Sequence, residues 1–175
     1  MLLARHATIS NNRSIGVEIA QMGAYGKADD PTLAKWYRKS AGGQTVLTPP
    51  KPFDQMGVKT PRFQGVCDRA ELIVDDIQKT KLHQHDFTPQ QYDSLIKLTA
   101  TLCTVFPRMK CDYPKDAKGD LIPYKLTEAQ WKNFHGVLGH YHVQLNKTDP
   151  GPAFNWEKVI GGAKALMETE VAAKK

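Results

Sequence analysis

The chain has 175 residues, of which 41% are hydrophobic and 24% are charged, and its net charge is +6. This length suits one domain with a hydrophobic core, and this composition excludes a collagen, a coiled coil and a fully disordered chain. No apolar run approaches the roughly 18 residues that span a bilayer, and the basic residues are scattered along the chain. We therefore expect no membrane span and no nucleic-acid partner, while the oligomeric state stays open.

The first strong element is the segment Ser14–Ala20. Ile15, Val17 and Ile19 alternate there with small or polar residues. β-Branched residues with a period of two are typical of a strand, so we predict a strand in this segment. Glu18 would then lie on the opposite face between two small residues, either in solvent or pointing into a cleft.

Residues 22–70 have a different character. They contain several Pro and Gly breakers and little periodic apolar sequence. We interpret this stretch as a long irregular insertion in a single domain that covers residues 1–175. A second strand is predicted at Leu72–Val74, and it continues weakly towards Leu82.

Two capping boxes predict the starts of two helices. Thr88 and Gln91 form the first box, before a helix that Pro107 ends. Thr127 and Gln130 form the second box, before a short helix. Both helices are therefore predicted from local sequence alone.

A third helix is predicted to begin near Asn155, and its Ala- and Lys-rich tail at residues 168–175 is expected to fray. Strands and helices thus mix in one chain. This mixture predicts an α/β fold with a small central mixed β-sheet flanked by helices.

Three cysteines do not make a disulfide scaffold. Cys103 lies in an apolar helical pattern and is predicted to be a core thiol. A bridge between Cys67 and Cys111 stays open.

The densest group of possible metal ligands lies after residue 139. His140 follows an apolar segment, and Asp149 begins a rigid Asp-Pro-Gly-Pro loop. Imidazole and carboxylate groups both bind zinc, and a rigid loop suits the fixed distances of a metal site. An Asp before Pro-Gly is also a common turn residue, and a single His is often a structural group. From the residues alone, both interpretations stay open.

Two separated motifs resemble the zinc-dependent N-acetylmuramoyl-L-alanine amidases of the amidase-2 type, which are relatives of the peptidoglycan recognition proteins. The first motif is N-N-R-S-I-G-V-E at residues 11–18. The second is Gly139-His140 followed by K-T-D-P-G-P-A-F-N-W at residues 147–156. The resemblance covers residues 5 to about 166, apart from residues 22–70, and it agrees in order, spacing and residue type.

The resemblance implies a site and a reaction. His140 and Asp149 would be two of three protein ligands of a catalytic Zn²⁺. Glu18 would be the acid/base that works on the zinc-activated water, and Lys147 would stabilise the developing oxyanion. The reaction would hydrolyse the amide bond between N-acetylmuramic acid and L-alanine in peptidoglycan or its fragments.

The resemblance also assigns His6 and Asn11 to substrate binding. The family's third zinc ligand is a His on a strand well upstream of the Glu18 strand, and only thirteen residues precede Ser14 here. We therefore expect the first strands of the fold and the first zinc ligand to be missing from this chain. His142 is an alternative to His140 as a ligand.

The leading prediction is thus a bacterial cell-wall amidase that acts on peptidoglycan or muropeptides. A non-catalytic peptidoglycan-binding module is the alternative, because the first zinc ligand is absent. A nucleic-acid binder is disfavoured by the scattered basic residues. The compartment stays open between the cell envelope and the cytoplasm.

Overall fold

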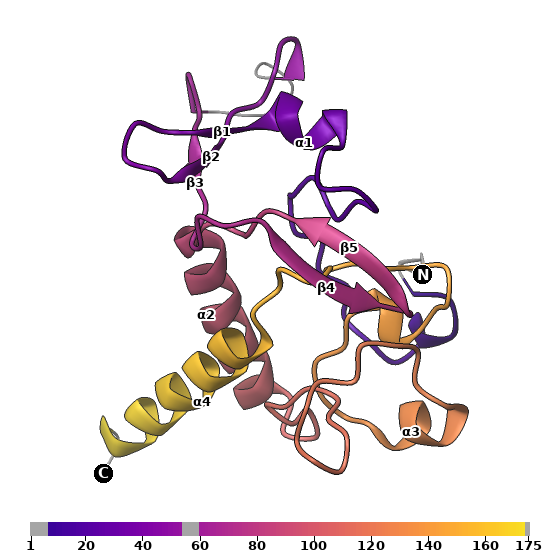
Figure 1. The fold of residues 1–175 in the computed structure, drawn as a ribbon. Helices are drawn as coiled ribbons and strands as arrows, with labels where there is room; N and C mark the ends of the chain where they lie inside the picture. Colours follow the sequence, from indigo (N-terminus) through magenta and orange to yellow (C-terminus); the bar gives the residue numbers. More distant parts are fainter. Residues whose placement is uncertain (1–6, 54–59, 174–175) are drawn as a thin grey trace.

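The protein's computed structural model describes residues 7–53 and 60–173. The strands in this part of the chain form two antiparallel sheets, with order β1-β2-β3 and β4-β5. Figure 1 shows the β4-β5 hairpin between the β1-β2-β3 sheet, which has α1 beside it, and the helices α2, α3 and α4. The elements are α1 (Pro31–Trp36), β1 (Tyr37–Lys39), β2 (Thr45–Leu47), β3 (Gly65–Val66), β4 (Ile73–Ile77), β5 (Thr80–Gln84), α2 (Pro89–Val105), α3 (Glu128–Asn133) and α4 (Trp156–Ala173).

These elements confirm an α/β chain in which small sheets are accompanied by helices. The strands belong to two antiparallel sheets and not to one central mixed sheet. The weak strand expected to run on from Leu72 is the hairpin β4-β5. Its two turn residues, Gln78 and Lys79, both have positive φ, at 54° and 62°. Positive φ at both central positions is typical of a type I′ turn, which matches the twist of a hairpin.

The predicted helices are confirmed, and so are their caps. The side chain of Thr88 accepts a hydrogen bond from the backbone of Gln91, which closes the capping box of α2. Thr127 and Gln130 form the same box at α3. Helix α4 continues through Ala173 and does not fray from residue 168 as expected. Figure 1 shows α2 and α4 side by side, and they pack against each other.

An aromatic core joins the hairpin to these two helices. Phe87 and Phe154 meet edge to face, with their ring centroids 5.7 Å apart and their planes at 87°. This geometry is favourable for aromatic pairs because the ring edge is positive and the ring face is negative. The buried cluster consists of Ile77, Leu82, Phe87, Tyr92, Tyr113, Tyr141, Phe154, Trp156, Val159 and Ile160.

Residues 22–70, interpreted as an irregular insertion, contain more regular structure than the sequence indicated. This stretch holds α1 and the β1-β2-β3 sheet, and it has a buried cluster of its own made by Leu33, Tyr37 and Cys67. Asp30 caps α1 by accepting a hydrogen bond from the backbone of Thr32. The strands have two or three residues each, so they are too short to carry a visible period.

The strand predicted at Ser14–Ala20 is also absent, because residues 14–24 belong to no strand. Ile15 and Val17 are 58% and 49% exposed. A strand needs a second strand to pair with, and in the described part of the chain no strand pairs with Ile15 or Val17. The segment is instead attached at its end, where the backbones of Tyr25 and His83 exchange two hydrogen bonds.

The three cysteines are free. Cys67 lies in the buried cluster of the insertion, whereas Cys111 packs on the aromatic core. The structure therefore contains no Cys67–Cys111 bridge. Cys103 is 6% exposed, which confirms it as a core thiol.

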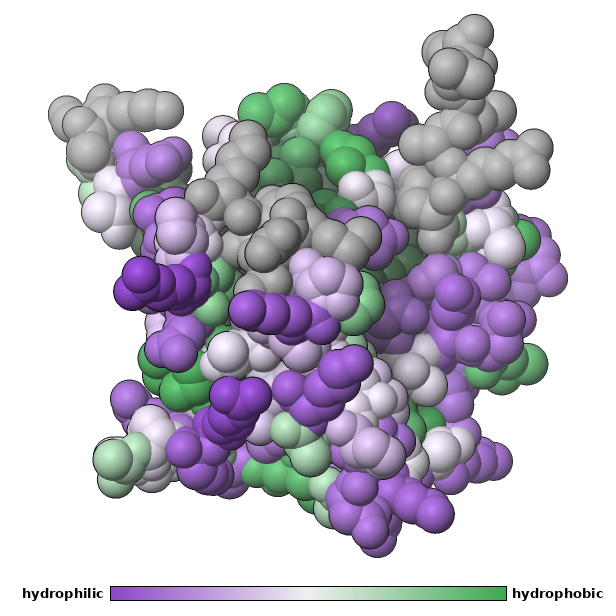
Figure 2. Space-filling view, turned by 90° about the horizontal axis from the view of Figure 1, so that it is seen from above, coloured by the Kyte–Doolittle hydropathy of each residue, from purple (hydrophilic) through white to green (hydrophobic). Residues whose placement is uncertain are grey.

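The surface is mixed. In the face shown in Figure 2, hydrophilic side chains cover most of the area and hydrophobic ones form separate patches among them. Within residues 7–53 and 60–173, no helix is long and apolar enough to cross a membrane.

Candidate active site

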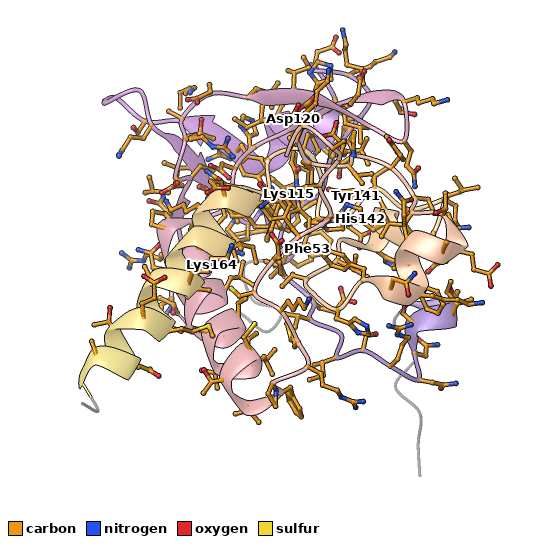
Figure 3. The ribbon with its side chains drawn as sticks, turned by 90° about the horizontal axis from the view of Figure 1, so that it is seen from below. Phe53, Lys115, Asp120, Tyr141, His142 and Lys164 are labelled. Atoms are coloured by element: carbon orange, nitrogen blue, oxygen red, sulfur yellow. The ribbon has the colours of Figure 1, made fainter. Side chains whose placement is uncertain are left out.

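The candidate site is built on the segment that joins the aromatic core to α4. It starts at Gly139 and continues into a single 3-10 turn, His140–His142. A Cβ on Gly139 would lie 2.8 Å from Cδ of Pro150, so the close approach of these two chain segments requires glycine. Tyr141 and His142 are fully buried and anchor the turn in the core (Figure 3).

His140 and Asp149 lie together, as their shared metal site would require. His140 Nδ1 is 3.0 Å from Asp149 Oδ2. The side chains are 18% and 61% exposed, so the pair lies at the surface and is open to solvent on the side of the carboxylate. Two ligand atoms bound to one tetrahedral zinc ion at about 2.1 Å lie roughly 3.4 Å apart. The donor types and their separation therefore fit a zinc ion with only a small adjustment.

His142 is not available as a ligand, and the alternative that placed it in the metal site is wrong. Its Nδ1 accepts a hydrogen bond of 2.9 Å from the backbone N–H of Gly139. Its Nε2 donates to the backbone oxygen of Ile122 at 2.8 Å. Burial lowers the pKa of His142 to about 4, so the ring stays neutral and both nitrogens are occupied.

Two glutamines of the β4-β5 hairpin hold the two ends of this segment. At the start, Gln78 Nε2 donates to the backbone oxygens of Tyr141 and Gln144, at 3.0 and 2.9 Å. At the end, Gln84 Nε2 donates to the backbone oxygen of Pro150, at 2.9 Å. The hairpin thereby fixes the backbone on both sides of the His140–Asp149 pair.

The Asp-Pro-Gly-Pro loop is shaped around Gln84. Gln84 is 1% exposed, and its Oε1 accepts a hydrogen bond from the backbone of Ala153 at 2.9 Å. Gly151 has φ +90°, and a Cβ at this position would overlap with the Gln84 amide. Glycine is therefore required both by the backbone conformation and by the space.

The segment that carries Glu18 reaches the same glutamine. Gln84 Nε2 also donates to Gln21 Oε1 at 3.2 Å, and Gln21 Nε2 donates to the backbone oxygen of His85 at 2.5 Å. Glu18 itself is exposed. Among the described residues, no hydrogen bond or ion pair joins it to His140 or Asp149.

The other residues predicted for the site are less closely placed. Lys147 is half-buried, and within residues 7–53 and 60–173 its ammonium group has no hydrogen bond or ion pair. Asn11 Oδ1 accepts a hydrogen bond from the backbone of Ala7, at 2.7 Å. His6 lies outside the described residues.

In the described ranges, no group of three or more His, Cys, Asp or Glu side chains is arranged to hold a metal ion. The described residues bring His140 and Asp149 together as two possible metal ligands. The model of the N-acetylmuramoyl-L-alanine amidase family matches residues 3–152.

The chain belongs to this family. The amidases of this family act on peptidoglycan and are generally zinc-dependent. Comparison with curated proteins and with solved structures gave no significant match.

Three residues of the amidase site escaped the sequence analysis: Gln78, Gln84 and Gln144. Gln84 gave a signal, because it shares the inward face of β5 with Leu82, where a polar residue must have partners. Gln144 gave a weaker signal, because it follows His140 by four residues and so returns to the same side of a helical turn. No sequence signal pointed to Gln78, because its hydrogen-bond partners come near it only in the folded chain.

Proposed function

We propose that this amidase hydrolyses the amide bond between N-acetylmuramic acid and L-alanine, and that it does so with a Zn²⁺ ion held by His140 and Asp149. The observation that supports the proposal is the 3.0 Å separation of His140 Nδ1 and Asp149 Oδ2. These two atoms are of the types that zinc binds in proteins, and the hairpin glutamines hold the backbone on either side of them.

The chemistry divides between the ion and the chain. When bound, Zn²⁺ supplies Lewis-acid polarisation of the carbonyl and lowers the pKa of a bound water to about 7. The Glu18 carboxylate takes a proton from the attacking water and delivers it to the nitrogen of the L-alanine that leaves. The bond between the carbonyl carbon and this nitrogen breaks as a bond to the water oxygen forms.

The remaining side chains act on charge and position. The Lys147 ammonium stabilises negative charge on the carbonyl oxygen, and a cation without a competing carboxylate is suited to that role. His6 and Asn11 contact the muramyl or peptide part of the substrate. Glu18 must approach the His140–Asp149 pair for the reaction, and the Gln21–Gln84 hydrogen bond ties its segment to the same loop.

A second candidate function is binding of peptidoglycan without hydrolysis. The observation that favours it is the ligand count, because the described residues bring together two possible ligands and catalytic zinc sites use three protein ligands. A two-ligand site is expected to bind zinc weakly, whereas a complete site is expected to hold about one ion per chain.

The test measures zinc content and the release of L-alanyl peptides from purified muropeptides. We expect Glu18→Gln to lower the rate by about 10²–10⁴-fold with unchanged zinc content, since general acid–base catalysis contributes that much. His140→Ala is expected to lose zinc and activity together. Glu71→Gln, at another exposed glutamate, is the matched control and is expected to keep the wild-type rate.

Two results would decide against hydrolysis by this mechanism. Release of peptides that chelators do not reduce and added zinc does not increase would exclude the zinc proposal. Tight binding of muropeptides without release, in zinc-loaded protein, would establish the binding module.

A further inference from the structure

The His140 ring has a second polar neighbour besides Asp149. Its Nε2 is 2.5 Å from Oε1 of Gln144, which is half-buried. Imidazole therefore lies between two oxygen atoms, a carboxylate oxygen at Nδ1 and an amide oxygen at Nε2. Neither oxygen carries a proton to donate.

We infer that Gln144 is a positioning residue for His140. Its Oε1 accepts a hydrogen bond from Nε2–H, so that Nδ1 presents its lone pair beside Asp149. This inference rests on the proposed function, because it assigns the metal-binding atom within the same site. It concerns a residue that does not itself touch the ion or the substrate.

The count of protons supports this assignment. A neutral imidazole has one N–H, and either flanking oxygen can accept a hydrogen bond from it; with a metal ion on Nδ1, the proton lies on Nε2 and Gln144 Oε1 is its acceptor. The Nδ1 lone pair then faces the Asp149 oxygen at 3.0 Å. Two lone pairs at this distance repel each other unless a cation lies between them. A metal ion ligated by both atoms supplies that cation.

His142 provides an internal comparison, because it belongs to the same 3-10 turn. Its Nδ1 has a backbone N–H as donor and its Nε2 has a backbone oxygen as acceptor. A neutral ring satisfies both partners there. His140 has an oxygen at each ring nitrogen instead, so the single N–H of a neutral ring serves one of them and a metal ion or a second proton must serve the other.

Backbone hydrogen bonds also position Gln144 beside His140. The backbone N–H of Gln144 donates to the oxygen of His140 at 3.0 Å, which closes one helical turn between the two residues. The backbone oxygen of Gln144 accepts from Gln78 Nε2. Because both backbone groups of Gln144 are hydrogen-bonded, its Cα is held next to the His140 ring.

The experiment compares zinc affinity in the wild type, Gln144→Ala and Gln144→Glu, by competition with a chelator of known affinity. Loss of such a partner typically weakens metal binding by about 10–100-fold, and this is the result expected for Gln144→Ala. Gln144→Glu keeps an acceptor oxygen and is expected to bind zinc at least as tightly as the wild type. Gln90→Ala, on the exposed start of α2, is the matched control and is expected to bind like the wild type.

A second readout is independent of activity and affinity. ¹⁵N-edited NMR of the zinc-loaded wild type is expected to show a His140 Nε2–H signal that is protected from exchange with solvent, and Gln144→Ala is expected to lose that protection. Equal zinc affinity in the wild type and Gln144→Ala, or a proton on Nδ1 of zinc-loaded His140, would overturn the inference while the proposed function stands. A wild type that does not bind zinc would overturn both.

Discussion

His142 is a buried histidine whose neutrality has a measurable consequence. Its pKa is lowered to about 4 by burial, whereas an unfolded histidine has a pKa of about 6.5. Between about pH 6.5 and pH 4 the unfolded chain protonates this histidine, whereas the folded chain keeps it neutral. Protonation therefore favours the unfolded state, and the stability that His142 contributes is lost as the pH falls from about 6.5 to 4. Linkage predicts a loss of about 2 kcal/mol between about pH 7.5 and pH 5.

The measurement is urea unfolding of the wild type and His142→Asn at these two pH values. The variant lacks the titrating ring, so its own free energy of unfolding does not include this loss. The difference in unfolding free energy between the wild type and the variant is therefore expected to be smaller by about 2 kcal/mol at about pH 5 than at about pH 7.5. Val143→Ala shortens a buried neighbour without any titration. Its deficit is expected to be equal at both pH values. A His142→Asn deficit that does not change with pH would contradict the prediction.

The site residues differ in how far the sequence alone could predict them. His140 and Asp149 could be singled out as possible ligands from the residues, and the family resemblance was needed to pair them. Glu18 could be singled out only by resemblance, since an exposed carboxylate on an extended segment is common. The supporting glutamine Gln78 was out of reach, because its partners, the backbone oxygens of Tyr141 and Gln144, lie more than sixty residues away along the chain.

The contact between α2 and α4 depends on a glycine at one position and not at its neighbour. A Cβ on Gly162 would lie 2.7 Å from Cδ1 of Ile96 on α2, whereas a Cβ on Gly161 would have only Glu157 Oε1, at 3.7 Å. Alanine in a helix interior is favoured over glycine by about 1 kcal/mol. Gly161→Ala is therefore expected to raise the free energy of unfolding by up to about 1 kcal/mol.

At the neighbouring position the same gain in helix propensity meets a clash. Overpacking typically costs about 1–3 kcal/mol, so Gly162→Ala is expected to be neutral or destabilising, and less stable than Gly161→Ala by at least about 1 kcal/mol. Thermal and urea unfolding of the two variants measure this difference. Two equally stabilised proteins would show that α2 and α4 do not pack at this glycine.

The elements that were predicted well are those whose signals are local. The capping boxes at Thr88 and Thr127 fix helix starts through side chains within three residues of each other. Strands depend on distant partners, and the segment 14–20 has the composition of a strand but pairs with none of the strands in the described chain. The β4-β5 hairpin was missed because its turn is Gln78-Lys79, and it lacks the Asn-Gly or Asp-Gly sequence that usually marks a type I′ turn.

On the scale of the whole molecule, a partly buried ion pair with a fully buried carboxylate joins the insertion to the body. Arg69 lies near the end of the insertion, and its Nε donates a hydrogen bond to Asp86 Oδ2 at 2.6 Å. Its guanidinium also donates to the backbone oxygen of Ala153, just after the loop that carries Asp149. Tyr92 of α2 completes the group by donating to Asp86 Oδ1 at 2.6 Å. Residues 69, 86, 92 and 153 therefore meet in one hydrogen-bonded group, and its contacts span up to 84 residues of sequence, which explains why no local pattern predicted it.

Removal of the arginine is expected to be costly, because the Asp86 side chain is 0% exposed and would stay charged without its cation. Breaking one side of a buried pair typically costs about 3–5 kcal/mol, and we expect a loss of this order for Arg69→Met in urea unfolding. Asp86→Asn added to Arg69→Met removes the buried charge, so the double variant is expected to recover part of that loss.

The control is the exposed pair of Lys97 and Asp93 on α2, whose side chains are 65% and 61% exposed. Lys97→Met is expected to change the free energy of unfolding by no more than about 0.5 kcal/mol, because water screens such a pair. If Arg69→Met were as mild as Lys97→Met, or if the double variant were less stable than Arg69→Met alone, the Arg69–Asp86 contact would not be what ties the insertion and the Asp149 loop to the aromatic core.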